Sequence, residues 1–235
     1  QQYEPLLDAL DLIKRHKIDY LLAVGGGSVV DGTKFIAAAS QYQGKDPWEI
    51  LANRGRVKSA LPLGVVLTLP ATGSESNAVS VVSRGNEKLS FVSSRVRPLF
   101  AVLDPSASLS LSPKQVSNGV IDAFVHVMEQ YLTYPVNAKV QDRFAEGLLL
   151  TLIEDGPKAL DKGSCDDLDI RANIMWTANL ALNGLIGMGV PQDWTTHMIG
   201  HEITAAHGLD HARTLSIMLP AVMKHQRNNK SEKLL

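Results

Sequence analysis

The sequence predicts an α/β domain followed by an all-α domain. In the first part of the chain, short apolar runs typical of buried strands alternate with segments of helical period. Such alternation indicates a parallel sheet covered by helices. Beyond about Ser110 the strand signal stops, and the remaining apolar patterns have the period of helices. We therefore expect the two domains to occupy residues 1–109 and 110–235.

The first passage from strand to helix contains a run of glycines. Residues 6–13 have helical spacing, and the apolar run 20–24 indicates a buried strand. A Gly-Gly-Gly-Ser motif at 25–28 separates that strand from a helical segment at 29–39. A helix that starts after a strand directs its free N–H groups at an anion, so the motif is a candidate phosphate loop. Because it is neither GxGxxG nor a Walker loop, a tight turn that needs glycine torsions is an equal alternative.

A second polar loop follows the next predicted strand. That strand covers 63–68, and the loop 69–77 is rich in hydroxyl and amide groups. Ligands of open α/β sheets bind at the carboxyl ends of strands, so this loop and residues 25–28 are expected to line one crevice. The alternative for the loop is a capped turn with Ser74 as a helix N-cap.

A hairpin and a last strand complete the α/β part. Residues 79–83 and 89–93 alternate between apolar and polar residues around a turn at 85–87. Lys88 begins the second of these strands, where a solvated lysine is the ordinary interpretation. The apolar run 98–103 predicts one more buried strand.

Five helices are predicted in the second part. Ser112 and Pro113 supply an N-cap and an N1 proline to the first helix, which runs to about Leu132. Gly208 is a natural stop for the fourth. The other helices are expected at 138–160, 169–185, 194–207 and 214–225.

Four of the seven histidines lie within one short segment, from His197 to His211. His197 and His201 are four residues apart and so share a helical face. Asp122 and His126 have the same spacing on an earlier helix, where an intrahelical hydrogen bond would explain that pair alone. Two helices that each offer a pair of ligands are what a metal site in a helical bundle requires. We interpret the two segments, the histidines of 197–211 and the pair Asp122 and His126, as one candidate metal site.

Composition limits the other functions. The chain has 45% hydrophobic and 20% charged residues, as an ordinary soluble protein has. The net charge of -1 and the lack of a basic run give no support for nucleic-acid binding. No apolar stretch is long enough to span a bilayer, and no signal peptide opens the chain, so we expect a cytoplasmic protein. The single Cys165 lies in a polar loop and is a poor metal ligand.

Taken in order, four motifs resemble the iron-containing (group III) alcohol dehydrogenases, whose fold is like that of dehydroquinate synthase. The branch that looks most similar contains NADPH-dependent aldehyde reductases and butanol dehydrogenases. Chains of that family continue on both sides, so this chain is expected to lack the first βαβ region and the last helices. The motifs are VGGGS at 24–28, TLPATGSE at 68–75, NGVIDAFVH at 118–126, and His197-x3-His201-x9-His211 with Pro220 after it.

The resemblance also implies roles for individual residues. It implies that the dinucleotide is NADP(H) rather than NAD(H), although the region that contacts the 2′-phosphate lies outside this chain. We take His201 to be a catalytic proton relay, with packing beside the metal as the alternative, and His207 to be a bystander. One divalent metal, iron or zinc, would be bound by Asp122, His126, His197 and His211. The dinucleotide would be lined by Gly26, Gly27, Ser28, Asp31, Thr68, Thr72, Asn77 and Lys88.

The implied activity is hydride transfer between NADP(H) and a small aldehyde or primary alcohol. A divalent metal would polarise the carbonyl oxygen. The partners implied are that substrate and further copies of the chain, as a homodimer or larger homo-oligomer. Three alternatives remain: a glycerol dehydrogenase-like polyol oxidoreductase, a metallohydrolase with the same ligands, and a non-catalytic metal-binding fragment. The apolar Trp194, Met188 and Met198 disfavour the first, and the glycine loop disfavours the second.

Overall fold

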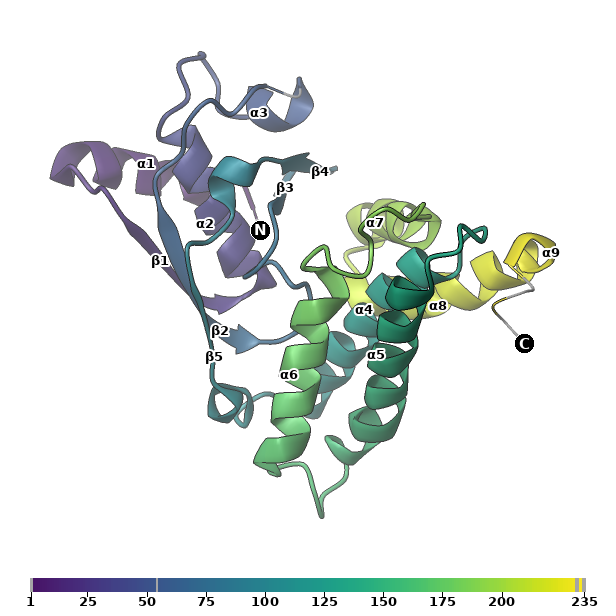
Figure 1. Ribbon diagram of the computed structural model, residues 1–235. Coiled ribbons are helices and arrows are strands. Elements are labelled where there is room, and N and C mark those ends of the chain that lie inside the picture. The colour runs from purple at the N-terminus through teal and green to yellow at the C-terminus, as the bar shows by residue number, and fades with distance from the viewer. Residues whose placement is uncertain (1, 54, 231–232, 234–235) are drawn as a thin grey trace. The chain divides into compact units, whose positions relative to one another are not determined.

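The computed structural model describes residues 2–53, 55–230 and 233 (Figure 1). The chain divides into two compact units. Unit 1 comprises Gln1–Thr68 and Ser74–Asp104, and unit 2 comprises Leu69–Gly73 and Pro105–Leu235. A five-residue piece of the polar loop therefore belongs with the helices, which the sequence did not predict.

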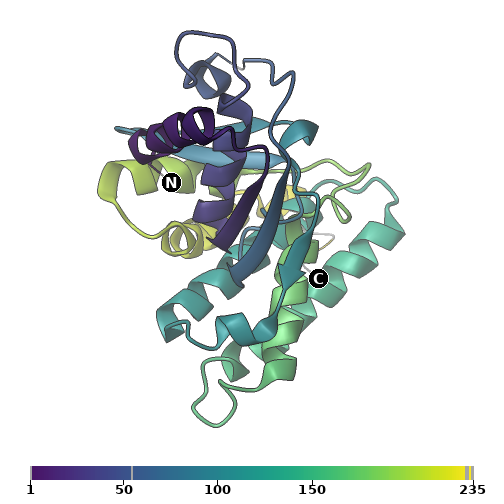
Figure 2. The same ribbon diagram turned by 90° about the vertical axis from the view of Figure 1, so that its left-hand side faces the viewer.

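The centre of unit 1 is a three-stranded sheet with the strand order β1-β2-β5, whose strands lie side by side in Figure 2. Strands β2 and β5 are parallel, with Val65 opposite Ala101. Helix α2 packs against the sheet through Val30 and Ala37. The strands are β1 (Leu21–Gly26), β2 (Leu63–Leu69) and β5 (Ala101–Leu103), and α2 is Gly27–Ala39.

The predicted hairpin is present, whereas the last predicted strand is shorter than expected. Strands β3 and β4 pair in antiparallel fashion, with Ser83 opposite Lys88. In the run 98–103 only the last three residues form a strand; proline at position 98 cannot donate a ladder hydrogen bond. The other elements of unit 1 are α1 (Glu4–His16), α3 (Glu49–Ala52), β3 (Val79–Arg84), β4 (Glu87–Val92) and η1 (Ser94–Val96).

The glycine motif forms no separate turn. Strand β1 continues to Gly26, and α2 starts at the next residue. Gly26 is extended, with φ of -88°, and Gly25 and Gly27 have no positive φ. The alternative of a turn that needs glycine torsions is therefore wrong. Of the other alternative, a capped turn with Ser74 as N-cap, the turn is present at 74–76, but no helix follows Ser74 before β3.

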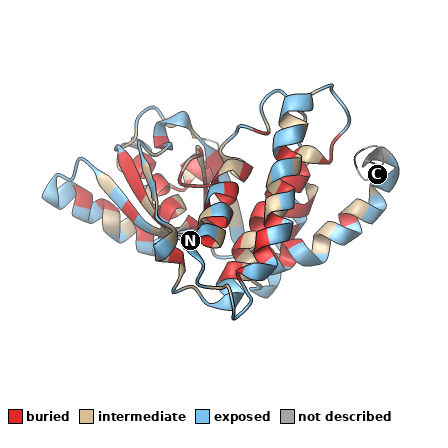
Figure 3. Ribbon diagram, turned by 60° about the horizontal axis from the view of Figure 1, so that its bottom comes forward, coloured by how far each residue is buried: buried red, intermediate tan, exposed pale blue. Residues whose placement is uncertain are grey.

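Unit 2 is helical, and its longest helices pack along one another. Helix α4 contacts α5, α6 and α8. In Figure 3 the long helices of this unit are red on the sides that face one another and pale blue outside. The elements are η2 (Pro105–Ser108), α4 (Pro113–Tyr131), α5 (Lys139–Lys158), α6 (Leu168–Leu182), α7 (Thr195–His207), α8 (His211–His225) and α9 (Arg227–Lys230).

The predicted helix start at Ser112 and the predicted helix stop at Gly208 are both present. Ser112 forms a capping box with Gln115 at the start of α4. Gly208 ends α7 in the left-handed conformation, with φ of 65°, and α8 begins three residues later. None of the described helices combines the length and hydrophobicity that a bilayer crossing requires.

The loop piece Leu69–Gly73 lies against α4. A Cβ atom at Gly119 of α4 would be only 2.3 Å from the carbonyl oxygen of Pro70. This close approach explains a glycine in the middle of a long helix, where glycine otherwise weakens the helix. Helix α4 thus packs an apolar face, with Ala123 and Val127, into the helical core and buries polar residues as well.

Candidate metal centre

Three helices contribute the residues of the candidate metal centre. Asp122 and His126 lie one turn apart on α4. His197 is the third residue of α7, and His211 is the first residue of α8. The left-handed turn at Gly208 lets α8 reverse direction, so that a histidine from each side of the turn reaches the same carboxylate.

Asp122 is the point on which the imidazoles converge. Its Oδ1 atom lies 3.9 Å from Nε2 of His126, 3.7 Å from Nε2 of His197 and 3.8 Å from Nε2 of His211. These separations are too long for hydrogen bonds. Ligand atoms that share one ion, each about 2 Å from it, lie roughly 3 to 4 Å apart. The geometry is therefore that of a ligand set.

The four predicted ligands are not equally close to one another. Asp122, His197 and His211 each offer one ligand atom, and these three atoms lie within 4.8 Å of one another. His126 falls outside that group, although its Nε2 atom faces the same carboxylate oxygen. Its ring stacks on His197, with centroids 4.5 Å apart.

Burial makes this arrangement costly without an ion. Asp122, His126 and His197 are each 4–5% exposed. The Oδ1 atom of Asp122 and the Nε2 atom of His197 are buried and accept or donate no hydrogen bond. An unsatisfied buried polar atom costs about 1–3 kcal/mol. A divalent ion would satisfy both atoms, so the residues fit a metal.

The pKa values follow from burial and from the facing charges. Burial alone would raise the pKa of Asp122, but the imidazoles of His126, His197 and His211 hold it below its usual value. Burial lowers the pKa of His126 to about 3, against the attraction of Asp122. Asp122 is thus an anion and His126 a neutral imidazole at neutral pH, which are the forms that bind metals.

Glu129 is a further buried residue beside the candidate ligands, and the sequence did not predict it. It is 3% exposed and lies on α4 two turns after Asp122. One carboxylate oxygen pairs with Nδ1 of His197, and the other accepts from the backbone N–H of Thr196 at 2.5 Å and of His197 at 3.3 Å. Burial would lower the pKa of His197, but Asp122 and Glu129 together raise it to about 9. The spacing Asp122-x3-His126-x2-Glu129 on one helical face was the available signal.

The remaining histidines differ in their position. The ring of His201 lies 4.9 Å from that of His211 and 6.3 Å from that of His197, measured between centroids. It is half-buried beside the candidate ligands and is not among the three clustered ligand residues. His207, at the end of α7, is exposed.

The start of α8 is tied to α4 by charge. Asp210, the residue before His211, accepts from Lys114 at 2.6 Å and from Asn118 at 3.4 Å. Both donors belong to the first turns of α4. These bonds fix the first turn of α8, and with it the backbone of His211, to the helix that carries Asp122.

The predicted cofactor residues other than Thr72 lie in unit 1, and their surroundings differ. Gly26 ends β1, and the first residues of α2 have no side-chain cap, so their N–H groups are not taken by a capping side chain. Asp31 instead takes part in an internal network: its carboxylate accepts from Ser74 Oγ at 2.5 Å and from the N–H of Val81 at 3.1 Å. Gly27 and Ser28 begin α2, Thr68 lies in β2, Thr72 and Asn77 lie in the polar loop, and Lys88 lies in β4.

The network around Asp31 is centred on Lys34, which the sequence analysis did not single out. Lys34 is fully buried, and its Nζ atom donates to Ser74 Oγ at 2.8 Å, to Asn77 Oδ1 at 3.0 Å and to the carbonyl of Val79 at 2.8 Å. Burial lowers the pKa of Lys34 to about 8, against the attraction of Asp31. The lysine holds the part of the polar loop that belongs to unit 1.

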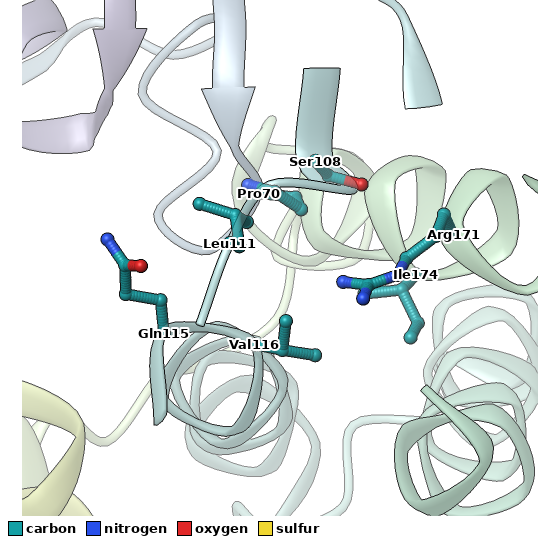
Figure 4. Close-up of a pocket in the computed structure, with 7 residues that line it drawn as sticks. All are labelled: Pro70, Ser108, Leu111, Gln115, Val116, Arg171 and Ile174. Atoms are coloured by element: carbon teal, nitrogen blue, oxygen red, sulfur yellow. The ribbon is translucent and has the colours of Figure 1, made fainter. Parts of the chain in front are cut away.

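A small hollow in unit 2 lies apart from the histidines (Figure 4). Apolar side chains make most of its lining, and Arg171, which donates to the carbonyl of Cys165 at 2.8 Å, lies on one side. None of the predicted site residues lines it. We therefore place the functional site by chemistry, at Asp122, and not at this hollow. The lining residues are Pro70, Ser108, Leu111, Gln115, Val116, Arg171 and Ile174.

Comparison with known families decides the identity of the fold. The pattern described as "Iron-containing alcohol dehydrogenase" matches residues 2–105. The pattern described as "Fe-containing alcohol dehydrogenase family, C-terminal" matches residues 116–235, more than half of the chain. The chain belongs to the iron-containing alcohol dehydrogenase family. This confirms the resemblance that the four sequence motifs predicted.

Individual members of the iron-containing alcohol dehydrogenase family are similar over most of the chain. The NADPH-dependent aldehyde reductase YqhD of Escherichia coli (strain K12) is 62% identical over 237 residues, which cover 99% of this chain and 61% of that protein. The probable NADH-dependent butanol dehydrogenase 1 of Bacillus subtilis (strain 168) is 42% identical, over 91% of this chain and 55% of that protein. The chain thus spans about three fifths of the length of the more similar relative.

Solved structures of iron-containing alcohol dehydrogenases have the same fold. The crystal structure of E. coli K-12 YqhD aligns with a TM-score of 0.96 and 61% identity, over 100% of this chain and 60% of that chain. The NADH-dependent butanol dehydrogenase A of Thermotoga maritima aligns with a TM-score of 0.91 and 33% identity, over 96% of this chain and 57% of that chain. The prediction of an incomplete two-part fold, α/β and then helical, is confirmed.

Proposed function

We propose that the protein acts as a metal-dependent alcohol dehydrogenase or aldehyde reductase. It would transfer hydride between NADP(H) and a small aldehyde or primary alcohol. The single observation that supports this most strongly is the buried Oδ1 atom of Asp122, which faces three imidazole Nε2 atoms without a hydrogen bond. Membership in the iron-containing alcohol dehydrogenase family supports the reaction type.

Four residues would hold one divalent ion: Asp122, His126, His197 and His211. When bound, the ion would act as a Lewis acid on the oxygen of the substrate carbonyl. The family description favours iron, while one carboxylate with three imidazoles is compatible with zinc as well. Because Asp122 and His126 are almost completely buried, their interactions with an ion are weakly screened by water.

The proposed dinucleotide contacts, apart from Thr72, belong to unit 1. We propose that Gly26, Gly27 and Ser28 present backbone N–H groups to the pyrophosphate, since the start of α2 has no capping side chain. Thr68, Thr72, Asn77 and Lys88 would line the rest, and Asp31 would act by holding the polar loop. The name of the 62% identical relative favours NADPH, whereas the butanol dehydrogenase relatives are named for NADH.

The finer assignments depend on the family resemblance. We propose His201, which lies against His211, as the residue that relays a proton to the alcoholate product. We also propose a dinucleotide-binding domain at 1–109, a metal-binding domain at 110–235, a homodimer or larger homo-oligomer, and a cytoplasmic location. The polyol oxidoreductase and the non-catalytic fragment become outcomes of the test below.

The test is NADPH oxidation by the purified chain with butanal as substrate. We expect turnover with NADPH that exceeds turnover with NADH, that stops after treatment with a chelator, and that returns when iron or zinc is added. Glycerol with NADP serves as the polyol control. Turnover that is unaffected by the chelator, or that occurs with glycerol alone, would overturn the proposal. A folded chain that binds metal without turnover would identify it as a non-catalytic fragment.

A further inference from the structure

Glu129 interacts with α7 through both of its carboxylate oxygens. One oxygen pairs with Nδ1 of His197, and the other accepts from the backbone N–H groups of Thr196 and His197. The backbone carbonyl of Glu129 also accepts from the N–H of Asp193, just before α7, at 2.9 Å. Glu129 of α4 thus accepts from three nitrogen atoms of α7 and from one just before it.

We infer that Glu129 is the positioning residue of the metal centre. Its carboxylate would fix the ring of His197 and keep the proton of that ring on Nδ1. This inference rests on the proposed metal site, since it assigns a role to a residue behind one of the proposed ligands. Glu129 itself faces the far side of the His197 ring and is not proposed as a ligand.

The role follows from the two nitrogens of an imidazole. A neutral histidine carries its proton on one nitrogen and a lone pair on the other. A His197 that binds a metal is neutral, and because Glu129 accepts from Nδ1, the lone pair would then lie on Nε2, the atom that faces Oδ1 of Asp122 at 3.7 Å. A carboxylate bonded to the outer nitrogen also makes the ligand nitrogen more basic. The hydrogen bond to Glu129 would therefore set both which nitrogen of His197 binds the metal and how basic that nitrogen is.

Glu129 also replaces an N-cap that α7 lacks. The N-cap position is Trp194, which makes no side-chain cap hydrogen bond. The Oε1 atom of Glu129 takes up N–H groups of the first turn instead, and its negative charge lies at the positive end of the helix. The backbone of His197 is therefore held by the same carboxylate that holds its side chain.

The variant Glu129→Gln separates these two contacts with almost no change in size. A glutamine amide has one acceptor oxygen and one donor NH2 group. It can accept either from Nδ1 of His197 or from the backbone N–H groups of α7, and its NH2 group then faces a donor on the other side. We expect the Zn2+ dissociation constant to rise by about 10- to 100-fold, the usual effect of removing such a partner.

Asp155→Asn is the matched control. Asp155 is also a buried carboxylate of unit 2, at 7% exposure, and accepts from Lys158 at 2.8 Å and from Asn173 at 3.0 Å. Neither partner is a proposed metal ligand. This variant is expected to lower stability while leaving the Zn2+ dissociation constant unchanged.

The experiment measures Zn2+ binding by the chain through competition with a chromophoric chelator, at several pH values. NMR of the Zn2+-loaded protein with 15N-labelled histidine reports which nitrogen of His197 is protonated. Weaker binding only in Glu129→Gln, with a proton on Nδ1 in the parent protein, supports the inference. Equal binding by Glu129→Gln and parent overturns it, as does equal weakening in both variants.

The NMR measurement needs no variant, so it still tests the position of the His197 proton if Glu129→Gln does not fold. A proton on Nε2 of His197 in the loaded parent protein would overturn the inference together with the assignment of His197 as a ligand through Nε2. Failure of the parent chain to bind Zn2+ or Fe2+ would overturn the proposed function, and the inference with it.

Discussion

The two units each bury a polar cluster, and the clusters differ in how their polar atoms are satisfied. In unit 1, Lys34 donates three hydrogen bonds and Asp31 accepts from Ser74 and from the backbone of Val81. In unit 2, the Oδ1 atom of Asp122 is equally buried, faces three imidazoles and makes no hydrogen bond. Burial alone therefore does not distinguish a structural cluster from a binding site.

The difference indicates which of the two clusters requires a bound ligand, such as a metal ion, to satisfy its polar atoms. Buried polar atoms in folded proteins are almost always paired, so the paired cluster of Lys34 is explained by the fold itself. Atoms of Asp122 and His197 that converge at more than 3.5 Å and remain unpaired would be satisfied by an ion between them, as we propose. The first cluster should determine stability, and the second should determine metal binding.

The largest expected effect is the loss of metal from unit 2. Asp122→Asn and His197→Ala each remove a proposed ligand, so the affinity for Fe2+ or Zn2+ should fall by more than the roughly 100-fold that partners behind a ligand contribute. Metal content measured after dialysis, with far-UV circular dichroism as a check on folding, tests this.

His207→Ala is the control for these ligand variants. His207 lies on the same helix as His197 but is exposed, so this variant should retain the metal. Equal metal loss in all three variants would refute the ligand assignment.

The second largest effect should be a loss of stability, without loss of metal, when the buried cluster of unit 1 is disrupted. Lys34→Met removes the donor from the buried cluster of unit 1 and leaves the carboxylate of Asp31 without its countercharge. Leaving a buried hydrogen-bond acceptor without its donor costs about 1–3 kcal/mol. Urea unfolding should show a decrease of that size, while the Zn2+ dissociation constant of the folded protein stays the same. A decrease in the free energy of unfolding of less than about 1 kcal/mol would show that the Lys34 cluster does not determine the stability of unit 1.

The smallest effect concerns the turn between the two histidine-bearing helices. Gly208→Ala places a side chain at a φ of 65°, which should lower the free energy of unfolding by about 1–2 kcal/mol. Because the turn lies between His197 and His211, metal binding should weaken as well.

Gly147→Ala tests the same exchange inside α5, where a Cβ atom would meet no neighbour within 4 Å. It should raise stability by about 0.5–1 kcal/mol and leave metal binding unchanged. Thermal unfolding of both variants checks the opposite signs, and two changes of the same sign would contradict the role of the turn.

Much of the fold was predictable because its signals are local. The capping box at Ser112, the stop at Gly208 and the hairpin each depend on a few neighbouring residues. The run 98–103 was overestimated because apolar character predicts burial and not the length of a strand.

The site was only partly predictable, because much of it depends on distant contacts. In the sequence Lys34 resembles an ordinary helix lysine, because its partners Ser74 and Asn77 lie 40 and 43 residues later in the chain. Glu129 was visible from its spacing to Asp122, but its role appears only when α7 is placed against it. The ligand roles and cofactor contacts of the sequence analysis remain predictions.

The loop piece Leu69–Gly73 has a consequence for how this family can be divided genetically. The helical unit is encoded by two separate stretches, because these five residues belong to it while lying upstream of β3, β4 and β5. A gene fragment that begins at Pro105 would omit Pro70, against whose carbonyl α4 packs at Gly119. The α/β and helical halves are therefore not modules that recombination could exchange with a single crossover; any exchange must carry the loop as well.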